Sequence, residues 1–188
     1  MIVFRVGINL NLWYNLIMKK IAIIGVTASG KTTLANKLGT MLNIPVYHLD
    51  KIAWKDNGVF ASQAEIIEKV SEILNKSSWI IDGSMHRSKT LEMRIKEADT
   101  IISYNLPFYI NLWRQTKRFF KYYNKVRPDM GGNNKQKYPF TWKDIKYNIN
   151  YSKEEMHSKM EPYLNKKKII IIKNIRDESL VFKNLGIN

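Results

Sequence analysis

The chain has 188 residues, of which 45% are hydrophobic and 25% charged, a composition that fits one folded domain and excludes a disordered polypeptide. It contains no cysteine, which excludes a disulfide scaffold and any thiolate metal site and suits a cytoplasmic protein. The formal net charge of +15 favours phosphate-bearing partners, although a lysine-rich genome composition would give the same excess. The charge is concentrated, because the segment from Arg114 to Lys146 carries ten basic and two acidic residues.

Residues 1–18 differ from the rest of the chain, because apolar residues there are mixed with Arg5 and several asparagines. The segment is too short and too polar to predict a membrane span. It also lacks the basic start and the small-residue cleavage site of a signal peptide. We interpret it as an N-terminal extension, with a docked strand and a surface anchor as the alternatives, and we expect one domain over residues 19–188.

From Lys20 onward, apolar runs alternate with segments of helical period, which is typical of a βα-repeating α/β fold with a parallel sheet. The apolar runs predict strands at 21–24, 46–48, 79–82, 100–105 and 169–172. The helical periods predict helices at 31–42, 62–74, 89–96, 107–124 and 141–164, and a short helix after residue 178. Ser62 is a candidate N-cap for the second helix.

The segment at about 125–140 has the composition of a mobile lid over a site. It contains a turn-rich, basic-flanked loop from Pro128 to Asn134, in which Gly131 and Gly132 are candidate hinges. No internal repeat and no linker divides the chain, so the lid is expected to belong to the single domain.

The strongest motif is the run from Gly25 to Thr32, which matches the phosphate-loop pattern G-x-x-x-x-G-K-[ST] in full. An apolar strand precedes it and an amphipathic helix follows it, as the chemistry requires. The glycines let main-chain N–H groups turn toward phosphates, and the helix N-terminus adds its positive dipole end. Lys31 can reach the β- and γ-phosphates, and the Thr32 hydroxyl can ligate Mg²⁺. The residues expected to bind ATP are Gly25, Ala28, Ser29, Gly30, Lys31, Thr32 and Thr33.

Other features narrow the class of phosphate-loop protein. The guanine-reading N/T-K-x-D element of GTPases does not occur in the chain, and no predicted strand ends in the Asp-Glu pair of large ATPase motors. The small size and the basic segment after the fourth strand favour a kinase that transfers phosphate between small molecules.

Several sequence blocks, in order, resemble the adenylate-kinase-related phosphate-loop proteins called the DNA topology modulation family. The blocks are I-A-I-I-G-V-T-A-S-G-K-T-T-L, I-P-V-Y-H-L-D-K-I-A-W-K, W-I-I-D-G-S-M-H-R, A-D-T-I-I-S-Y-N-L-P, W-R-Q-T-K-R and R-P-D-M-G. They fall within the stretch from Lys20 to Gly132, which is more than half of the chain. The resemblance implies a three-layer α/β/α sandwich with a five-stranded parallel sheet of the nucleoside-monophosphate-kinase type, in the order 2-3-1-4-5.

The resemblance also implies roles for two acids, and strand ends are where an open α/β sheet places its ligands. Asp50, taken to end the second strand, would face the phosphate acceptor. Asp82, at the end of the third strand, would hold a magnesium-bound water or a substrate hydroxyl. Adenylate kinases have D-G-F-P-R at this point, whereas this chain has D-G-S-M-H-R, so Arg87 lies one residue later and the Phe-Pro pair is missing. AMP is therefore a less favoured acceptor, although Arg87 can still bind an anionic group.

The helix predicted at 107–124 carries Arg114 and Arg118 on one face. In a kinase these are lid arginines that neutralise charge on the transferring phosphate, with Arg127 beside the acceptor. A solvated helix face is the alternative. The opposite face carries Leu112 and aromatic residues that we expect to point toward the core, namely Tyr109, Trp113, Phe120 and Tyr123.

The sequence therefore predicts a phosphotransferase that uses ATP and Mg²⁺ and acts on a small-molecule or nucleotide acceptor. Lys31, Asp50, Asp82, Arg114 and Arg118 are the candidate catalytic residues. The alternative is a nucleotide-dependent regulator that binds nucleic acid, because lysines interleave with aromatic residues from Lys117 to Tyr147.

Overall fold

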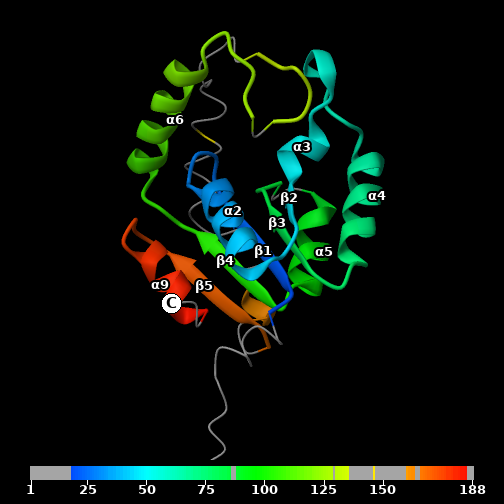
Figure 1. The fold of residues 1–188 in the computed structure, drawn as a ribbon, viewed down its shortest axis with the longest axis vertical. Coiled ribbons are helices and arrows are strands. Elements are labelled where there is room, and N and C mark those ends of the chain that lie inside the picture. The colour runs from blue at the N-terminus through cyan, green and yellow to red at the C-terminus, as the bar shows by residue number, and fades with distance from the viewer. Residues whose placement is uncertain are drawn as a thin grey trace, which may run out of the picture.

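The computed structural model describes residues 18–85, 88–128, 130–135, 146, 160–163 and 166–185. Five parallel strands form one sheet in the order β2-β3-β1-β4-β5 (Figure 1). This order confirms the predicted topology. The strands are β1 (Lys20–Gly25), β2 (Val46–His48), β3 (Trp79–Asp82), β4 (Thr100–Tyr104) and β5 (Lys168–Ile172).

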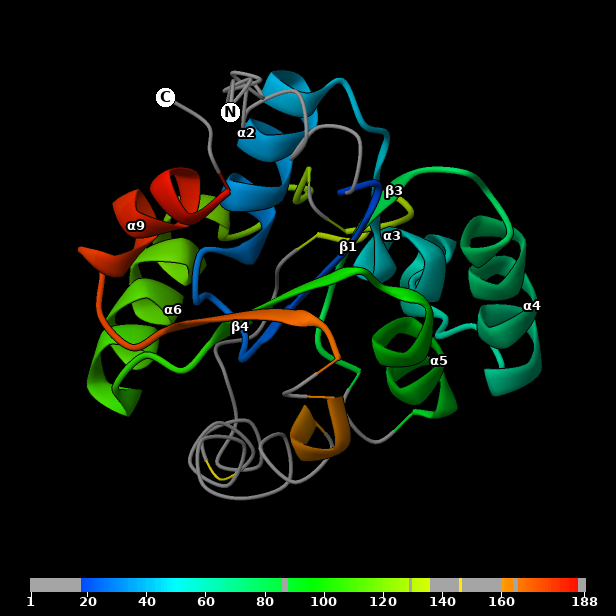
Figure 2. The same ribbon diagram turned by 90° about the horizontal axis from the view of Figure 1, so that it is seen from below.

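Helices cover both faces of the sheet, which confirms the three-layer architecture (Figure 2). The central strand β1 is apolar from Ile21 to Ile24, and its side chains alternate between the two faces. Ile21 and Ile23 pack in the cluster that contains Leu38, whereas Ala22 and Ile24 belong to the cluster on the other face. The first cluster is covered by α2 (Lys31–Leu42) and α9 (Asp177–Asn184), and the second by α3 (Leu49–Ala53), α4 (Gln63–Leu74) and α5 (Lys89–Glu97).

Local signals set several of the element boundaries. Ser62 caps α4 through a reciprocal pair of hydrogen bonds, in which its hydroxyl accepts from the Glu65 N–H and its own N–H donates to the Glu65 carboxylate. At the start of β1, the Asp99 carboxylate accepts hydrogen bonds of 2.8 Å from the N–H groups of both Lys19 and Lys20. Met18 is 3% exposed and packs in the core. The first described strand, β1, is thus anchored at its start by Met18 and Asp99.

Helix α6 (Phe108–Tyr122) corrects one expectation about orientation. Its aromatic residues were expected to face the core, yet Tyr109, Trp113 and Phe120 are at least 60% exposed, and Tyr123 just beyond the helix is also exposed. The buried residues of α6 are Asn111 and Gln115 instead. Helical periodicity shows that a helix has two unlike faces, but it does not show which face meets the rest of the protein. The inner face of α6 lies beside the phosphate loop at the carboxyl end of the sheet. Polar side chains on this face can form hydrogen bonds there.

Some predicted elements lie outside the described residues, and some observed elements were not predicted. Most of the helix predicted at 141–164 is outside the described ranges, as are residues 1–17. The short elements α3 and η1 (Asp56–Gly58) were not predicted. Within the described part of the chain, no helix is both long enough and apolar enough to cross a bilayer.

Candidate functional site

The phosphate loop connects β1 to α2 at the carboxyl end of the sheet. Gly25 has a φ of 149°, and a Cβ there would lie 2.6 Å from the Tyr104 Cβ, so only glycine fits. Gly30 precedes α2 with a φ of 111°, and Ala28 also has a positive φ, of 62°. The loop therefore takes a tightly turned path into the start of α2, a conformation in which main-chain N–H groups can line an anion site.

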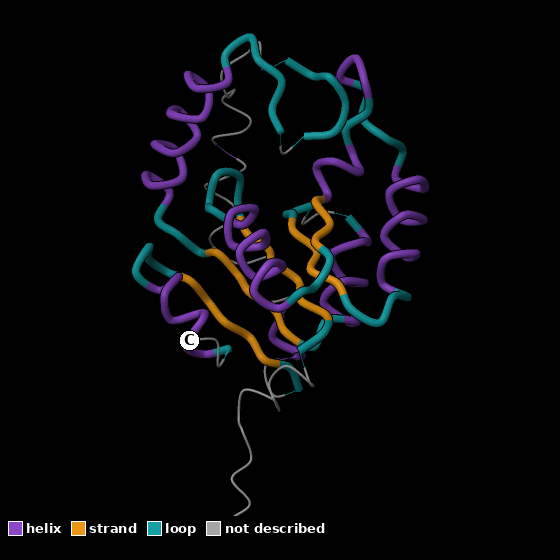
Figure 3. The backbone as a smooth tube through the Cα atoms, viewed as in Figure 1, coloured by secondary structure: helices purple, strands orange, loops and turns teal. Residues whose placement is uncertain are grey.

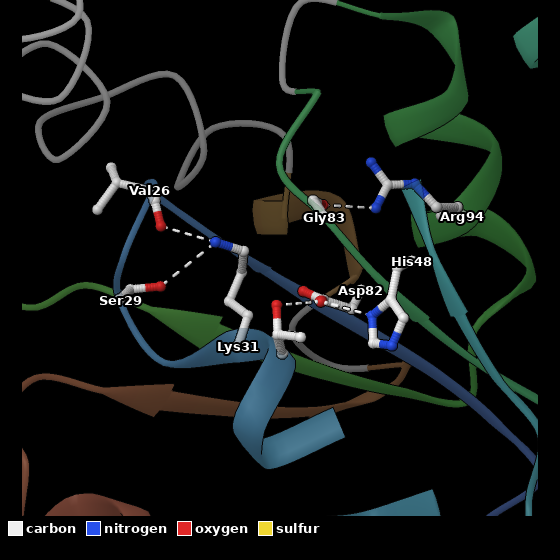
Figure 4. Close-up of polar contacts among 8 residues, drawn as sticks. Val26, Ser29, Lys31, His48, Asp82, Gly83 and Arg94 are labelled. Atoms are coloured by element: carbon white, nitrogen blue, oxygen red, sulfur yellow. Dashed lines mark hydrogen bonds and ion pairs between the residues drawn. The ribbon is translucent and has the colours of Figure 1, made fainter. Parts of the chain in front are cut away.

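The Lys31 side chain is folded into this loop (Figure 4). Its Nζ donates to the Val26 carbonyl oxygen at 2.7 Å and to the Ser29 hydroxyl at 3.4 Å, and the residue is 8% exposed. Ser29 is fully buried, whereas Thr33 is exposed on the first turn of α2. The structure thus brings the ammonium group into the ring of the loop, where it can exchange carbonyl contacts for phosphate oxygens.

Asp82, the last residue of β3, faces the start of α2. The Thr32 hydroxyl donates to the Asp82 Oδ2 at 2.7 Å. A hydroxyl that donates its proton in this way keeps both lone pairs for another ligand. Asp82 is 4% exposed, and among the described residues its Oδ1 is buried without a hydrogen-bond partner. A free carboxylate oxygen beside a hydroxyl is a set of hard oxygen donors that suits Mg²⁺, either directly or through water.

His48, which was not predicted as a site residue, also contacts Asp82. It is the last residue of β2, it pairs in register with Asp82, and its Nδ1 lies 3.0 Å from the Asp82 Oδ2. The alternation of a strand predicts that residues 46 and 48 share a face, but it does not give the register between strands. That register is what brings His48 to Asp82.

Arg94 on α5 supports the loop that follows Asp82, and it was also not predicted. Its guanidinium is fully buried and donates to the carbonyl oxygens of Gly83 at 2.8 Å, Ser84 at 3.0 Å and Thr90 at 3.1 Å. The Ser84 hydroxyl in turn donates to the Gly25 carbonyl. Arg94 therefore holds the end of β3 against the phosphate loop.

Three side chains approach the other side of the phosphate loop. Arg114 of α6 donates from Nη1 to the Ser29 carbonyl at 2.6 Å, so one of the two predicted lid arginines does reach the loop. A Cβ built at Gly30 would lie 3.2 Å from this Nη1 and 3.1 Å from the Glu178 Oε1. Burial, with the Glu178 carboxylate next in importance, raises the pKa of Tyr104, so this phenol stays neutral. Glu178 and Tyr104 were not predicted as site residues.

The other predicted site residues, on the acceptor side, differ in where the structure places them. The strand β2 ends at His48, so Asp50 does not end it but lies two residues later, exposed in the first turn of α3. Arg118 is half-buried on α6, and Arg127 is 9% exposed in the loop beyond it. Arg87 lies outside the described residues. Of the predicted catalytic residues, those that the structure gathers around the phosphate loop are Lys31, Thr32 (predicted to bind Mg²⁺), Asp82 and Arg114.

The loop of residues 127, 128 and 130–134 belongs to the segment at about 125–140 that was expected to be a mobile lid, and it reaches from beyond α6 to α3 (Figure 3). We call its contacts with residues 51–58 the clasp. A Cβ at Gly131 would lie 2.1 Å from the Trp54 carbonyl oxygen, and one at Gly132 would lie 2.6 Å from that of Lys55. The two glycines, expected to be hinges, therefore permit close backbone contact. The Asn134 side chain adds two hydrogen bonds. Its Nδ2 donates to the Lys55 carbonyl at 2.7 Å, and its Oδ1 accepts from the Gly58 N–H.

Comparison with known proteins supports the fold assignment. A gluconokinase from Sinorhizobium meliloti 1021 matches with a TM-score of 0.56 and 9% identity, over 90% of both chains. The shikimate kinase of Aquifex aeolicus matches with a TM-score of 0.51 and 18% identity, over 89% of this chain and 93% of that one. The shikimate kinase of Bacteroides thetaiotaomicron matches with a TM-score of 0.52 and 14% identity, over 90% and 97% of the two chains.

These likenesses show that the chain has the fold of the phosphate-loop kinases. No protein-family model matches the chain, and no curated protein sequence matches it. The resemblance to the DNA topology modulation family therefore stays a resemblance in sequence blocks.

Proposed function

We propose that this protein is an adenylate-kinase-like phosphotransferase, which transfers the γ-phosphoryl group of ATP to a small-molecule or nucleotide acceptor. The observation that carries the proposal is the arrangement around the phosphate loop. There the Lys31 ammonium is enclosed by the loop. The Thr32 hydroxyl donates to Asp82 at the end of β3, the strand beside β1.

Each residue of this group has a chemical task in the proposed reaction. The amides from Gly25 to Thr33 and the Lys31 ammonium bind the phosphates, and Thr33 and Ser29 extend these contacts. Thr32, directly, and Asp82, through water, would hold Mg²⁺, which when bound neutralises phosphate charge. Arg114 already contacts the loop at Ser29 and can donate to a phosphate oxygen as negative charge spreads onto it. Catalysis would come from positioning and charge neutralisation.

The acceptor would bind on the side of α3 and the clasp. Asp50 would accept the proton of an acceptor hydroxyl, and Arg118, Arg127 and Arg87 would bind its anionic groups. The structural neighbours are named for gluconate and for shikimate, which favours a small hydroxylated acceptor over a polymer.

The test begins with binding of ATP to the wild-type protein by calorimetry, with and without Mg²⁺. A panel of nucleosides, nucleotides and small hydroxy acids is then assayed for ATP-dependent phosphorylation. Lys31→Ala should reduce ATP affinity or turnover at least about tenfold, because it removes the charge-assisted contacts to phosphate. Lys37→Ala, an exposed lysine of the same helix, should change neither. Retention of full ATP binding and turnover by Lys31→Ala would contradict the proposal.

A nucleotide-dependent regulator that binds nucleic acid is the second candidate, and the exposed face of α6 favours it. This face combines Tyr109, Trp113 and Phe120 with Lys117 and Lys121, and the sequence from residue 100 to 128 contains no acid. The Lys117 Nζ lies 4.9 Å from the centre of the Trp113 ring. Exposed rings can stack on bases while lysines contact phosphates.

This candidate predicts binding of single-stranded DNA that weakens steeply with salt. The double variant Lys117→Glu/Lys121→Glu should abolish this binding and leave ATP affinity unchanged. An absence of DNA binding at low salt in the wild-type protein would contradict the candidate.

A further inference from the structure

The orientation of the Asp82 carboxylate depends on two side chains that bind the same oxygen. Oδ2 accepts from the Thr32 hydroxyl at 2.7 Å and lies 3.0 Å from the His48 Nδ1 (Figure 4). An ionised carboxylate can only accept hydrogen bonds, so the contact requires His48 to carry its proton on Nδ1 and to donate it. His48 reaches this oxygen from β2, and Thr32 reaches it from α2 on the other side of β3.

The other oxygen of Asp82 is left without such contacts. Oδ1 is buried, and it has no hydrogen-bond partner among the described residues. A buried acceptor without a partner is unfavourable unless a ligand uses it. A carboxylate with both donors on Oδ2 cannot rotate to exchange its oxygens without breaking two hydrogen bonds, so Oδ1 stays directed away from His48.

We propose that His48 is a positioning residue for Asp82. By holding Oδ2 it keeps Oδ1 available to the Mg²⁺ hydration shell of a nucleotide bound in the phosphate loop. The inference rests on the proposed function, because it assigns His48 to the same MgATP site. The Thr32 hydroxyl alone would not hold the carboxylate in this way, because its rotatable proton follows the carboxylate as it turns. The imidazole of His48 is held on the backbone of β2 at a fixed register with Asp82.

Substitutions of His48 separate positioning from packing. In His48→Asn, the side-chain amide nitrogen takes the place of Nδ1 and keeps the donor. In His48→Gln, the amide nitrogen lies near the position of Nε2, so this variant has no donor at the position of Nδ1. His48→Leu keeps much of the volume and removes all donors. Tyr47→Phe is a matched control on the same strand, because it removes a hydrogen bond at 2.9 Å between the Lys76 Nζ and the Tyr47 hydroxyl, outside the site.

The measurement is the affinity for ATP by calorimetry, with Mg²⁺ and with EDTA, and the ratio of the two affinities. Loss of a residue that orients a metal-binding group typically weakens metal affinity about 10- to 100-fold. We therefore expect His48→Leu and His48→Gln to lose most of the gain in ATP affinity that Mg²⁺ provides. Their affinity for ATP in EDTA should stay the same as that of the wild type. His48→Asn should stay within about threefold of the wild type, and Tyr47→Phe should be unchanged.

Three results would overturn the inference. One is a normal Mg²⁺-dependent gain in His48→Gln, and another is an equal loss in His48→Asn and His48→Gln. The third is a fall in metal-free affinity as large as the fall with Mg²⁺. If His48→Leu does not fold, the comparison of the Asn and Gln variants decides the matter. A wild-type protein that shows no Mg²⁺-dependent ATP binding would overturn the proposed function as well, whereas normal wild-type binding with unaffected variants would overturn only the role of His48.

Discussion

Arg94 is a fully buried charged residue, and its guanidinium donates hydrogen bonds to three main-chain carbonyls. Arg94→Met would keep most of the volume but leave the Gly83 and Ser84 carbonyls unsatisfied. Lost hydrogen bonds to a charged group and unsatisfied buried carbonyls together predict a destabilisation of about 3 kcal/mol. The free energy of unfolding from urea titration measures it.

Arg94→Lys is the matched control for charge. A single ammonium cannot reproduce the planar fork that spans two carbonyls, so this variant should recover only part of the loss. A stability of Arg94→Met equal to that of the wild type would show that the loop after β3 does not depend on this guanidinium.

The sequence predicts the roles of some site residues and not of others. Lys31, Thr32 and Gly25 lie in a motif with fixed spacing, and Asp82 ends an apolar run, so all four could be placed at a strand end before the structure was known. His48 also ends a predicted strand, but its contact with Asp82 could not be assigned in this way, and neither could the contacts of Arg94. Their roles depend on strand register and on the packing of α5 against a loop, which are contacts between segments distant in sequence.

The clasp between residues 127–134 and 51–58 is an interaction between two short elements, and backbone proximity dominates it. Gly131→Ala would place a Cβ 2.1 Å from the Trp54 carbonyl oxygen, so the loop must move away. Steric overpacking of this kind predicts a destabilisation of about 1–3 kcal/mol. Thermal unfolding, together with the susceptibility of the 127–134 loop to limited proteolysis, measures the effect.

Two asparagines provide a matched pair for the same contact. Asn134→Ala removes hydrogen bonds to Lys55 and Gly58 and should also release the loop. Asn133→Ala should not, because Asn133 contributes its main-chain N–H, which donates to the Asp56 carboxylate at 2.8 Å. Equal proteolysis of the two variants would contradict the clasp.

The cap of α4 predicts a dependence of stability on pH. A hydrogen bond from the Lys55 side chain, then bonds from the Ser62 backbone and side chain, lower the pKa of Glu65 from 4.5 to about 2. Because the pKa is lower in the folded protein, this stabilisation is present above pH 4.5 and is lost as the pH falls toward 2.

Glu65→Gln should therefore flatten the fall in unfolding free energy over this acid range, measured by urea titration at several pH values. Glu68→Gln, an exposed acid on the same helix, is the control. An unchanged pH slope in Glu65→Gln would contradict the assigned cause.

The periodicity of the sequence predicted the type and position of the helices and strands well. It predicted poorly which face of a helix points inward. The helix α2 and the strands β2 and β3 have the predicted bounds, and α4 begins at the predicted cap. The inward face of α6 was predicted wrongly, because its aromatic side suggested a core contact. The short helix α3 was missed, since five residues carry too little periodic signal.

For the whole molecule, the strand order was implied by the resemblance of the sequence blocks and not by the apolar pattern alone. The pattern predicts alternating strands and helices, and many strand orders satisfy it. The structure fixes the order through the pairing of β1 with both β3 and β4, which places the phosphate loop at the centre of the carboxyl edge of the sheet.

The domain proposed over residues 19–188 makes a final prediction for the whole molecule. Met18 is buried, and Asp99 binds the N–H groups of Lys19 and Lys20, so the core is secured from residue 18 onward. A chain that starts at Met18 should have an unfolding free energy within about 0.5 kcal/mol of the full chain, because the packing of Met18 and the hydrogen bonds of Lys19 and Lys20 at the start of β1 are kept. Its MgATP affinity should be unchanged.

Urea titration and calorimetry on the two chains measure these quantities side by side. Asp99→Ala in the shortened chain is the sensitised control, because it removes both hydrogen bonds at the start of β1 and should lower stability by about 1–3 kcal/mol. A shortened chain that is destabilised as much as this control would show that residues 1–17 are part of the domain. The alternative of a docked strand would then replace that of an extension.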